Sequence, residues 1–200
     1  MILIVIEFVG VDQNTLFRDE RLETIQYLLA QGCYGDITCA GAELASTSLW
    51  DVLSPVIEDS HWLGVAGATE SAWEVATGLS SSEACGYLHV SLTHASANEV
   101  AAGADGLATL LAQMGEEDVL ALIASHPSDP GYAIVSANNP IHGPSAAATV
   151  SDLALTLLAL AGRQRPDSIT GAALFSGPAT HETDEEAELR ERFRGLGYIA

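Results

Sequence analysis

The sequence contains no lysine, and its seven basic residues, all arginines, stand against 27 aspartates and glutamates, which gives a formal charge of -20. A surface of this sign repels nucleic acid and anionic lipid headgroups, so neither is expected as a partner. It also disfavours an anionic substrate unless cations are held locally. Alternatively, the charge is an adaptation to solubility or salt, because net charge bears on solubility and association rather than on fold.

Cysteine is also scarce. The chain has only Cys33, Cys39 and Cys85, an odd number with no CxxC pair. This pattern favours buried thiols in a reducing compartment, and we expect a cytoplasmic protein. No apolar run reaches the ~18 residues that would cross a membrane. The apolar start, MILIVIEFVGV, contains Glu7 and lacks the basic segment and cleavage site of a signal peptide, so it predicts a buried strand.

The 200 residues, 48% of them hydrophobic, can bury a sizeable core and fit a single domain over 1–200, with a charged C-terminal helix and tail over 181–200. Apolar runs predict strands at 2–9, 62–65, 87–92, 119–124 and 132–135. Apolar stripes and capping residues predict helices at 12–31, 42–53, 70–76, 98–114, 149–161 and 182–194. Strands that alternate with helices imply a mostly parallel sheet covered on both faces.

In such a sheet the reactive crevice lies beyond the carboxyl ends of the strands. The loops at these ends are expected at 9–14, 93–98 and 125–131. The last loop contains His126, which follows a predicted strand directly. A strand that delivers a histidine to a loop is a common way to build a metal site, so His126 is a candidate ligand.

Five segments are familiar in sequence and in order. They are LIVIEFVGVDQNTL, ETIQYLLAQGCYGDI, DVLALIASHP, VSDLALTLLALAGRQRPDSITGAAL and EEAELRERFRGLGYIA. Together they resemble the alkaline phosphatase superfamily, in its type I phosphodiesterase/nucleotide pyrophosphatase branch. The resemblance implies an α/β protein, a three-layer α/β/α sandwich with a mostly parallel central sheet. The stretch between Trp50 and Tyr87 replaces far more sequence in active relatives, which implies an alkaline phosphatase-like core that lacks the cap domain.

Active members of this superfamily hold two divalent cations, commonly zinc, and a threonine or serine attacks the phosphorus. The resemblance places Val9 where the first-strand aspartate belongs, and valine has no lone pair to give a metal. It places Ser125 where an aspartate normally precedes the histidine, here His126. His94 lies in about the right region for another histidine ligand, whereas the last ligand histidine is absent.

The nucleophile segment of the family resembles ASTSLWDVLSP. Matching its tryptophan places Ser46 at the nucleophile, with Thr47 as the near alternative; a structural role beside a helix is open for both. Asp12 is either a metal ligand or a helix cap. His126 is a leftover of the ancestral site, a ligand of a new one-metal site, or a residue with another role.

The resemblance and its missing ligands indicate a catalytically degenerate phosphatase/phosphodiesterase-like domain with no cofactor, which acts through binding or assembly. Its partner would be a second copy, as a homodimer, or an active relative. The alternative is a reduced metal-dependent phosphoester hydrolase. In that case His126, His94, Asp129 and Asp12 would hold zinc or another divalent cation, and Ser46 or a metal-bound water would attack.

A third hypothesis is a small-molecule binder. The stretch GVAGATE at 64–70 offers glycines before a predicted helix, and helix starts bind anions. It matches no full phosphate-binding pattern, and a tight strand-to-helix turn explains it equally.

Self-association would cover surface that the missing cap domain leaves open. Trp50, Trp62, Trp73 and Phe175 are candidates for exposed apolar groups, although tryptophans at such spacing also suit a core.

Overall fold

The structure, a computed structural model, describes residues 1–38, 49–66, 70–80, 85–93, 96–102, 104–115, 117–136 and 142–174. Within these residues a seven-stranded sheet has the order β3-β4-β1-β5-β6-β2-β7. Its strands are β1 (Leu3–Val9), β2 (Cys33–Asp36), β3 (Ser60–Ala66), β4 (Tyr87–Thr93), β5 (Val119–Ser125), β6 (Gly131–Val135) and β7 (Gly143–Pro144). All neighbours pair in parallel except β6, which is antiparallel to β5 and β2. The predicted mostly parallel sheet is confirmed.

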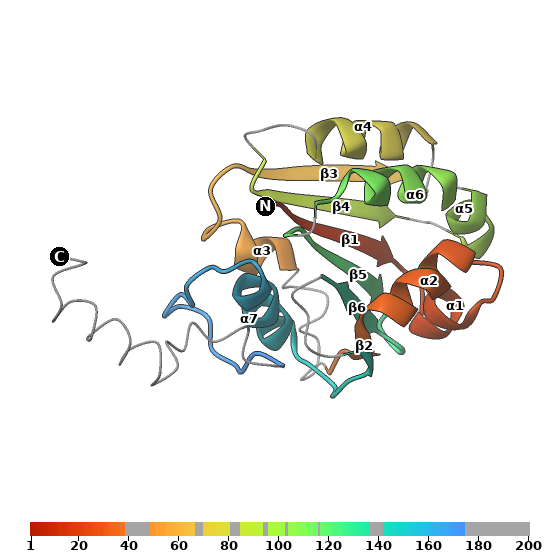
Figure 1. Cartoon of the computed structure of the whole chain (residues 1–200). Coiled ribbons are helices and arrows are strands. Elements are labelled where there is room, and N and C mark those ends of the chain that lie inside the picture. Colours follow the sequence, from red (N-terminus) through yellow and green to blue (C-terminus); the bar gives the residue numbers. More distant parts are fainter. Residues whose placement is uncertain are drawn as a thin grey trace, which may run out of the picture.

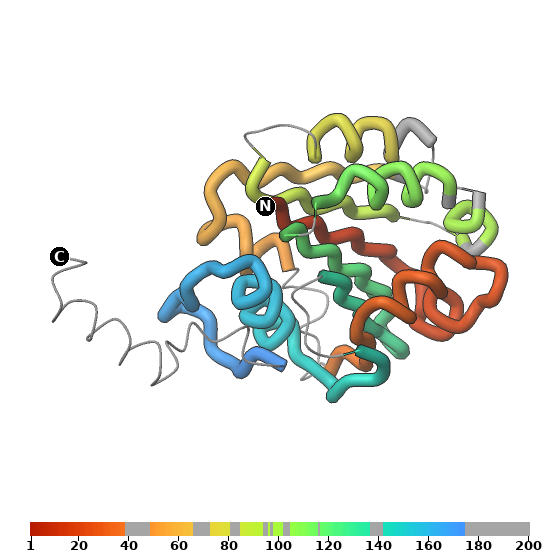
Figure 2. Tube along the Cα trace, viewed as in Figure 1, coloured from red at the N-terminus to blue at the C-terminus, as the bar shows by residue number. Residues whose placement is uncertain are grey.

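Helices cover both faces of this sheet, so the predicted three-layer sandwich is also confirmed (Figure 1). One face is covered by α1 (Gln13–Arg18), α2 (Glu23–Gln31), α4 (Glu70–Ser80), α5 (Ala97–Ala102) and α6 (Ala104–Gln113). The other face is covered by α3 (Leu49–Leu53) and α7 (Val150–Leu160). Figure 2 follows the chain through these layers from the N-terminus in the middle of the sheet.

The first strand shows why the sheet is buried on both sides. Ile4, Ile6 and Phe8 point into the core under the five-helix face, and Leu3 and Val5 point into the core under α3 and α7. Each of these side chains is at most 2% exposed. Fully burying one such side chain contributes about 1.5–3 kcal/mol, so a nearly continuous apolar run suits a central strand.

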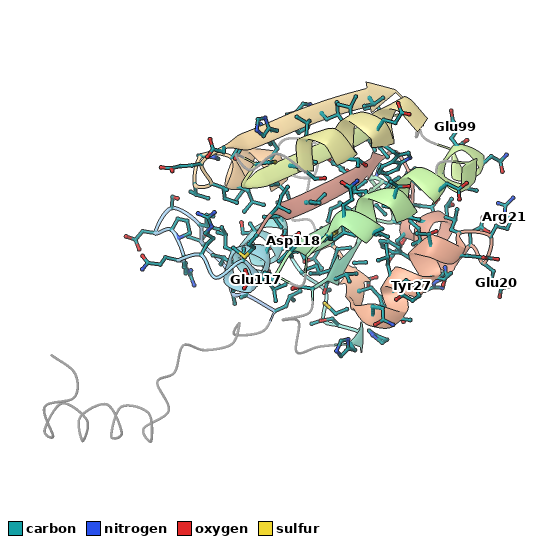
Figure 3. All side chains as sticks on the ribbon, turned by 45° about the horizontal axis from the view of Figure 1, so that its top comes forward. Glu20, Arg21, Tyr27, Glu99, Glu117 and Asp118 are labelled. Atoms are coloured by element: carbon teal, nitrogen blue, oxygen red, sulfur yellow. The ribbon has the colours of Figure 1, made fainter. Side chains whose placement is uncertain are left out.

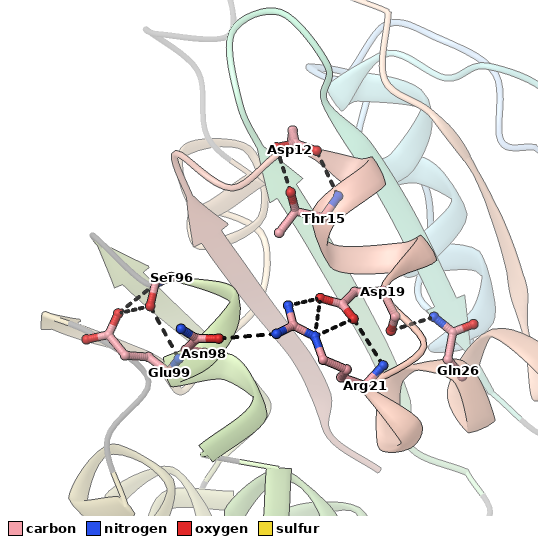
Figure 4. Close-up of polar contacts among 8 residues, drawn as sticks. All are labelled: Asp12, Thr15, Asp19, Arg21, Gln26, Ser96, Asn98 and Glu99. Carbon is pink, nitrogen blue, oxygen red and sulfur yellow. Dashed lines mark hydrogen bonds and ion pairs between the residues drawn. The ribbon is translucent and has the colours of Figure 1, made fainter.

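The single helix predicted over 12–31 is two helices, because a turn at Asp19 interrupts it (Figure 4). The Asp19 carboxylate accepts the Arg21 backbone N–H at 3.0 Å and the Arg21 guanidinium at 2.9 Å. These hydrogen bonds lower the pKa of Asp19 to about 2. Gln26 donates its amide N–H to the Phe17 carbonyl at 3.0 Å, so an orphan carbonyl at the end of α1 is satisfied.

Other predicted elements differ in extent. The strand predicted at 62–65 is the longer β3, and the helix predicted over 98–114 is described as α5 and α6, with residue 103 outside the described residues. Only α3 is described of the helix predicted at 42–53, and the predicted helix at 182–194 lies wholly outside the described residues. The strands β2 and β7 were not predicted, because they are short and contain glycine or proline in place of an apolar alternation.

The predictions about the cysteines and about membrane-spanning segments can be compared with the structure. Cys33 and Cys85 are buried, as expected; Cys39 lies outside the described residues. Every helix in the described part of the chain is too short or too polar to span a membrane.

A capping box starts α7, the helix of the segment that most resembles the phosphatase superfamily. Thr149 Oγ1 accepts the Asp152 backbone N–H at 3.1 Å, and Asp152 Oδ2 accepts the Thr149 backbone N–H at 3.0 Å. Asp152 Oδ1 also accepts the Ala172 backbone N–H at 2.7 Å. The Asp152 carboxylate therefore links the start of α7 to the segment around Ala172.

We expect Asp152→Ala to lower the free energy of unfolding by about 1–2 kcal/mol, because it removes a cap and the tie to Ala172. Urea denaturation measures this change, and Asp167→Ala, at an exposed turn, is the control expected to stay within about 0.5 kcal/mol. Equal stability of the two variants would contradict this role for the capping box.

The stabilisation by Asp152 should depend on pH. Burial works against the carboxylate, but hydrogen bonds from Thr149 and Ala172 outweigh it and lower the pKa of Asp152 below 3.8. A carboxyl whose pKa is lower in the folded state stabilises fully above its unfolded pKa and loses this effect as pH falls through the folded value. The stability difference between the natural chain and Asp152→Ala should therefore be constant above about pH 5 and shrink below about pH 4.

Candidate functional site

Three strands bring their carboxyl ends side by side at the edge where the resemblance places a metal site. Val9 of β1 lies opposite Thr93 of β4 on one side and Ser125 of β5 on the other. The Gly10 backbone N–H donates to the Ser125 carbonyl at 2.9 Å. The two positions where the resemblance requires aspartates are thus neighbours, and they carry an isopropyl group and a hydroxyl in place of carboxylates.

Asp12 caps α1 (Figure 4). Its Oδ1 accepts the Thr15 backbone N–H at 2.8 Å, and its Oδ2 accepts the Thr15 hydroxyl at 2.9 Å. The hydrogen bonds from Thr15 and the nearby His126 lower the pKa of Asp12. Both carboxylate oxygens are engaged in the cap, which is the structural alternative that the sequence left open.

His126 directly follows β5 and belongs to the turn that leads into β6. Its Nδ1 lies 2.9 Å from the Ser128 hydroxyl and 3.3 Å from the Ser128 backbone N. Its carbonyl accepts the Asp129 backbone N–H at 3.4 Å. One ring nitrogen is therefore engaged within the turn, and Nε2 is the nitrogen left for another partner.

Asp129 holds the turn after β5 against the start of α1. Its carboxylate accepts the Gln13 amide at 2.9 Å and also the Asn14 amide. Its carbonyl accepts the Gln13 backbone N–H at 3.0 Å. The same Gln13 amide nitrogen reaches Asp36 Oδ1 at 2.8 Å, so it separates two carboxylates that would otherwise repel each other. These contacts give Asp129 a structural role, while its predicted role as a metal ligand stays a prediction.

The structure thus brings Asp12, His126 and Asp129 to one end of the sheet but engages each of them locally. Over the described ranges, no group of three or more histidine, cysteine, aspartate or glutamate side chains could hold a metal ion. Ser46, Thr47 and His94 lie outside these ranges, so their predicted roles stay predictions. The described residues do not fit a pair of zinc ions.

A polar cluster on the α3/α7 side of the sheet was not predicted as a site. His89 of β4 is 1% exposed, and its two ring nitrogens lie 2.9 Å from the Tyr87 hydroxyl and 3.1 Å from Glu7 Oε2. The Trp62 ring stacks on the His89 ring with their centroids 4.6 Å apart, and Trp50 stacks on Tyr87 at 5.6 Å. We call Glu7, Tyr87, His89, Trp50 and Trp62 the histidine cluster.

The sequence carried a signal for this cluster. Tyr87, His89 and Ser91 alternate along a strand, which places them on one face, and Glu7 interrupts an otherwise apolar strand. The adjacency of β4 to β1 joins the two signals, and that adjacency is a property of the fold. Because His89 is almost fully buried with both ring nitrogens engaged, the cluster holds the sheet together rather than presenting a reactive group.

A cleft of about 690 Å³ lies between α1, α2 and the strands β2 and β7. Its described lining includes Gln13, Arg18, Tyr34 and Ser145. The described predicted site residues, Asp12, His126 and Asp129, are not among the described lining residues, and neither are residues 64–66 and 70. In that stretch Gly64 lies in β3 and Glu70 begins α4, while 67–69 lie outside the described residues.

The comparisons with known proteins found a similar structure, but no match by sequence. No family model matches the chain, and no curated protein matches it. Among solved structures, the chain is similar to Ps i-CgsB of the alkaline phosphatase/sulfatase superfamily, described as a complex with k-i-k-neocarrahexaose. The TM-score is 0.61 at 10% sequence identity, and the match covers 85% of this chain and 74% of that one.

The chain has an alkaline phosphatase/sulfatase-like fold. At 10% identity the likeness shows the fold alone, and it agrees with the architecture that the sequence resemblance implied. The mostly parallel seven-stranded sheet flanked by helices resembles a sulfatase-like core. The activity of this chain has to be argued from its own residues.

Proposed function

We propose that this chain is a catalytically degenerate domain on an alkaline phosphatase/sulfatase-like scaffold, which acts by binding or assembly. The observation that carries the proposal is the row of Val9, Thr93 and Ser125 at the carboxyl edge. Divalent zinc is held by carboxylate, imidazole or thiolate ligands, and these side chains supply none of them. The chain would thus retain the fold, while Val9 and Ser125 replace the carboxylates that would hold the metal.

The neighbouring acidic groups do not replace the lost ligands. Asp12 and Asp129 accept hydrogen bonds from Thr15, Gln13 and Asn14, so binding a cation would require these contacts to break. Even loss of a group that only orients a metal ligand weakens metal binding about 10–100-fold. Loss of two ligand positions should therefore abolish the ancestral site.

The proposed partner is a second copy of the chain, or an active relative with the same scaffold. Neither nucleic acid nor an anionic membrane surface suits a formal charge of -20.

One observation favours a second candidate function, a reduced metal-dependent phosphoester hydrolase. His126 lies close enough to Asp12 to help lower the pKa of the Asp12 carboxyl. Together with His94 they would hold one divalent cation, which would activate a water or Ser46 when bound.

An activity assay separates the two functions. With purified protein, 4-nitrophenyl phosphate, its bis ester and 4-nitrophenyl sulfate, in the presence of zinc, magnesium, manganese or calcium, we expect hydrolysis equal to that of protein-free buffer. His126→Ala is the matched control, because activity from a contaminant would persist in it. If the natural chain turned over a substrate, and His126→Ala or Asp12→Asn abolished this turnover, the chain would be a hydrolase. The proposal of a catalytically degenerate domain would then be wrong.

A further inference from the structure

The strand β3 ends the sheet on the side away from β7. Within the described residues it pairs with β4 on one side and with no strand on the other, and α4 lies over it (Figure 1). An edge strand presents unpaired N–H and C=O groups that invite another strand. Natural proteins block such edges with charged residues or proline, and the β3 sequence, SHWLGVA, has neither.

Large apolar side chains are exposed beside this edge. Trp62 of β3 is 45% exposed although one face of its ring stacks on His89. Val75 of α4 is 48% exposed. Two residues along a helix turn by about 200°, so Val75 lies on the side of α4 opposite Trp73, the side chain that meets Gly106 of α6. Val75 therefore faces away from α6 and from the core that buries Trp73.

The charge of the chain limits what can lie against it. Two copies that each carry a formal charge of -20 repel, so they can meet only where carboxylates are few. No residue from Ser60 to Ala66 is acidic. The strand itself therefore adds no carboxylate repulsion between two copies that meet at this edge.

The direction of the β3 backbone fixes which residues can pair across the edge. The Thr93 hydroxyl donates to the Val65 carbonyl at 3.3 Å, so the Val65 main chain faces β4. Main-chain groups alternate along a strand, and those of Trp62 and Gly64 therefore face outward. An antiparallel pair centred on Leu63 sets Trp62 opposite Gly64 of the partner subunit, so that the indole lies beside a residue without a side chain.

We propose that two copies of this chain join through β3, antiparallel about a two-fold axis at Leu63, so that their sheets form one continuous sheet. Trp62 and the partner subunit's Gly64 exchange two main-chain hydrogen bonds, and the exposed Trp62 side chain is covered. This inference rests on the proposed role in assembly and names its surface and its partner.

The first test is the mass of the full chain by size-exclusion chromatography with light scattering at micromolar concentration. We expect twice the 20.9 kDa mass of one chain. Trp62→Glu places a charge in the edge and should weaken the dimer at least tenfold. Tyr27→Glu is the control, because Tyr27 is 65% exposed on α2, away from β3, and should leave the dimer intact (Figure 3). Circular dichroism checks that both variants fold.

The second test reports the register directly. Leu63 faces the partner subunit's Leu63 as a non-hydrogen-bonded pair, with Cα atoms about 4.5 Å apart, which is within the range of a disulfide. Leu63→Cys should therefore form a covalent dimer under mild oxidation. Val65→Cys should not, because the two copies of that residue lie four positions apart, about 13 Å.

The outcomes distinguish this inference from the broader proposal. A dimer that Trp62→Glu leaves intact, and that Leu63→Cys does not cross-link, would overturn the β3 interface while retaining self-assembly. A monomer throughout the micromolar range would overturn both the interface and self-association. Neither result affects the absence of hydrolysis, which the activity assay tests separately.

Discussion

Replacing Gly32 with alanine should destabilise the protein by about 3 kcal/mol, because the new Cβ would meet a strand backbone that cannot move. The Cβ position lies 2.2 Å from the Ile134 carbonyl oxygen. Ile134 is held on both sides, opposite Ala121 of β5 and Cys33 of β2. The effect is steric, since Gly32 has an extended φ of -130° that any residue adopts.

Urea denaturation measures the effect, and Gly78→Ala is the matched control. Gly78 lies within α4, and apart from its chain neighbours and the backbone of its own helix no described atom lies within 4 Å of its Cβ position. Alanine favours helix over glycine by about 0.8–1 kcal/mol, so this variant should gain stability. If Gly32→Ala proved as stable as the natural chain, the close approach of α2 to β6 in this fold would be wrong.

His89→Ala should lower the free energy of unfolding by about 4 kcal/mol, because it empties the centre of the histidine cluster. The change removes a ring that is 1% exposed and opens a cavity beneath Trp62. It also removes the partner of the Tyr87 hydroxyl, and a buried polar group left without a partner costs about 1–3 kcal/mol. Thermal and urea unfolding should agree on the size of this loss.

Two further variants test whether the loss comes from the cluster. His61→Ala removes a partly exposed histidine from β3 and should stay within about 0.5 kcal/mol of the natural chain. Tyr87→Phe keeps the packing but leaves a His89 nitrogen without its hydroxyl, and should cost about 1–3 kcal/mol. A His89→Ala loss no larger than that of His61→Ala would show that the cluster does not hold the sheet together.

The scaffold was largely predictable because its central strands are mostly apolar. A strand such as β1, with Leu3 and Val5 on one face and Ile4 and Ile6 on the other, belongs inside a parallel sheet whatever its neighbours are. The short strands β2 and β7 have no such pattern, since their pairing is set by β6 and by the chain after it. Their place in the sheet could only come from the fold.

The site was predictable only in part. The sequence resemblance put Val9 and Ser125 at two ligand positions, and the structure sets them side by side. The capping role of Asp12 was one of two stated alternatives, whereas the hydrogen bonds of Asp129 with Gln13 depend on contacts between distant segments. The histidine cluster had local signals in β1 and β4, but it joins three strands, so only the fold could bring these signals together.

The central claim is that an alkaline phosphatase/sulfatase-like scaffold here lacks the side chains that seat two cations. The most direct test is the zinc content of the full chain, purified without chelators, incubated with zinc, freed of loose metal by gel filtration and analysed by elemental mass spectrometry. The account predicts far less than one equivalent of zinc per chain, unchanged in His126→Ala. About two equivalents, as a two-metal site requires, would contradict it.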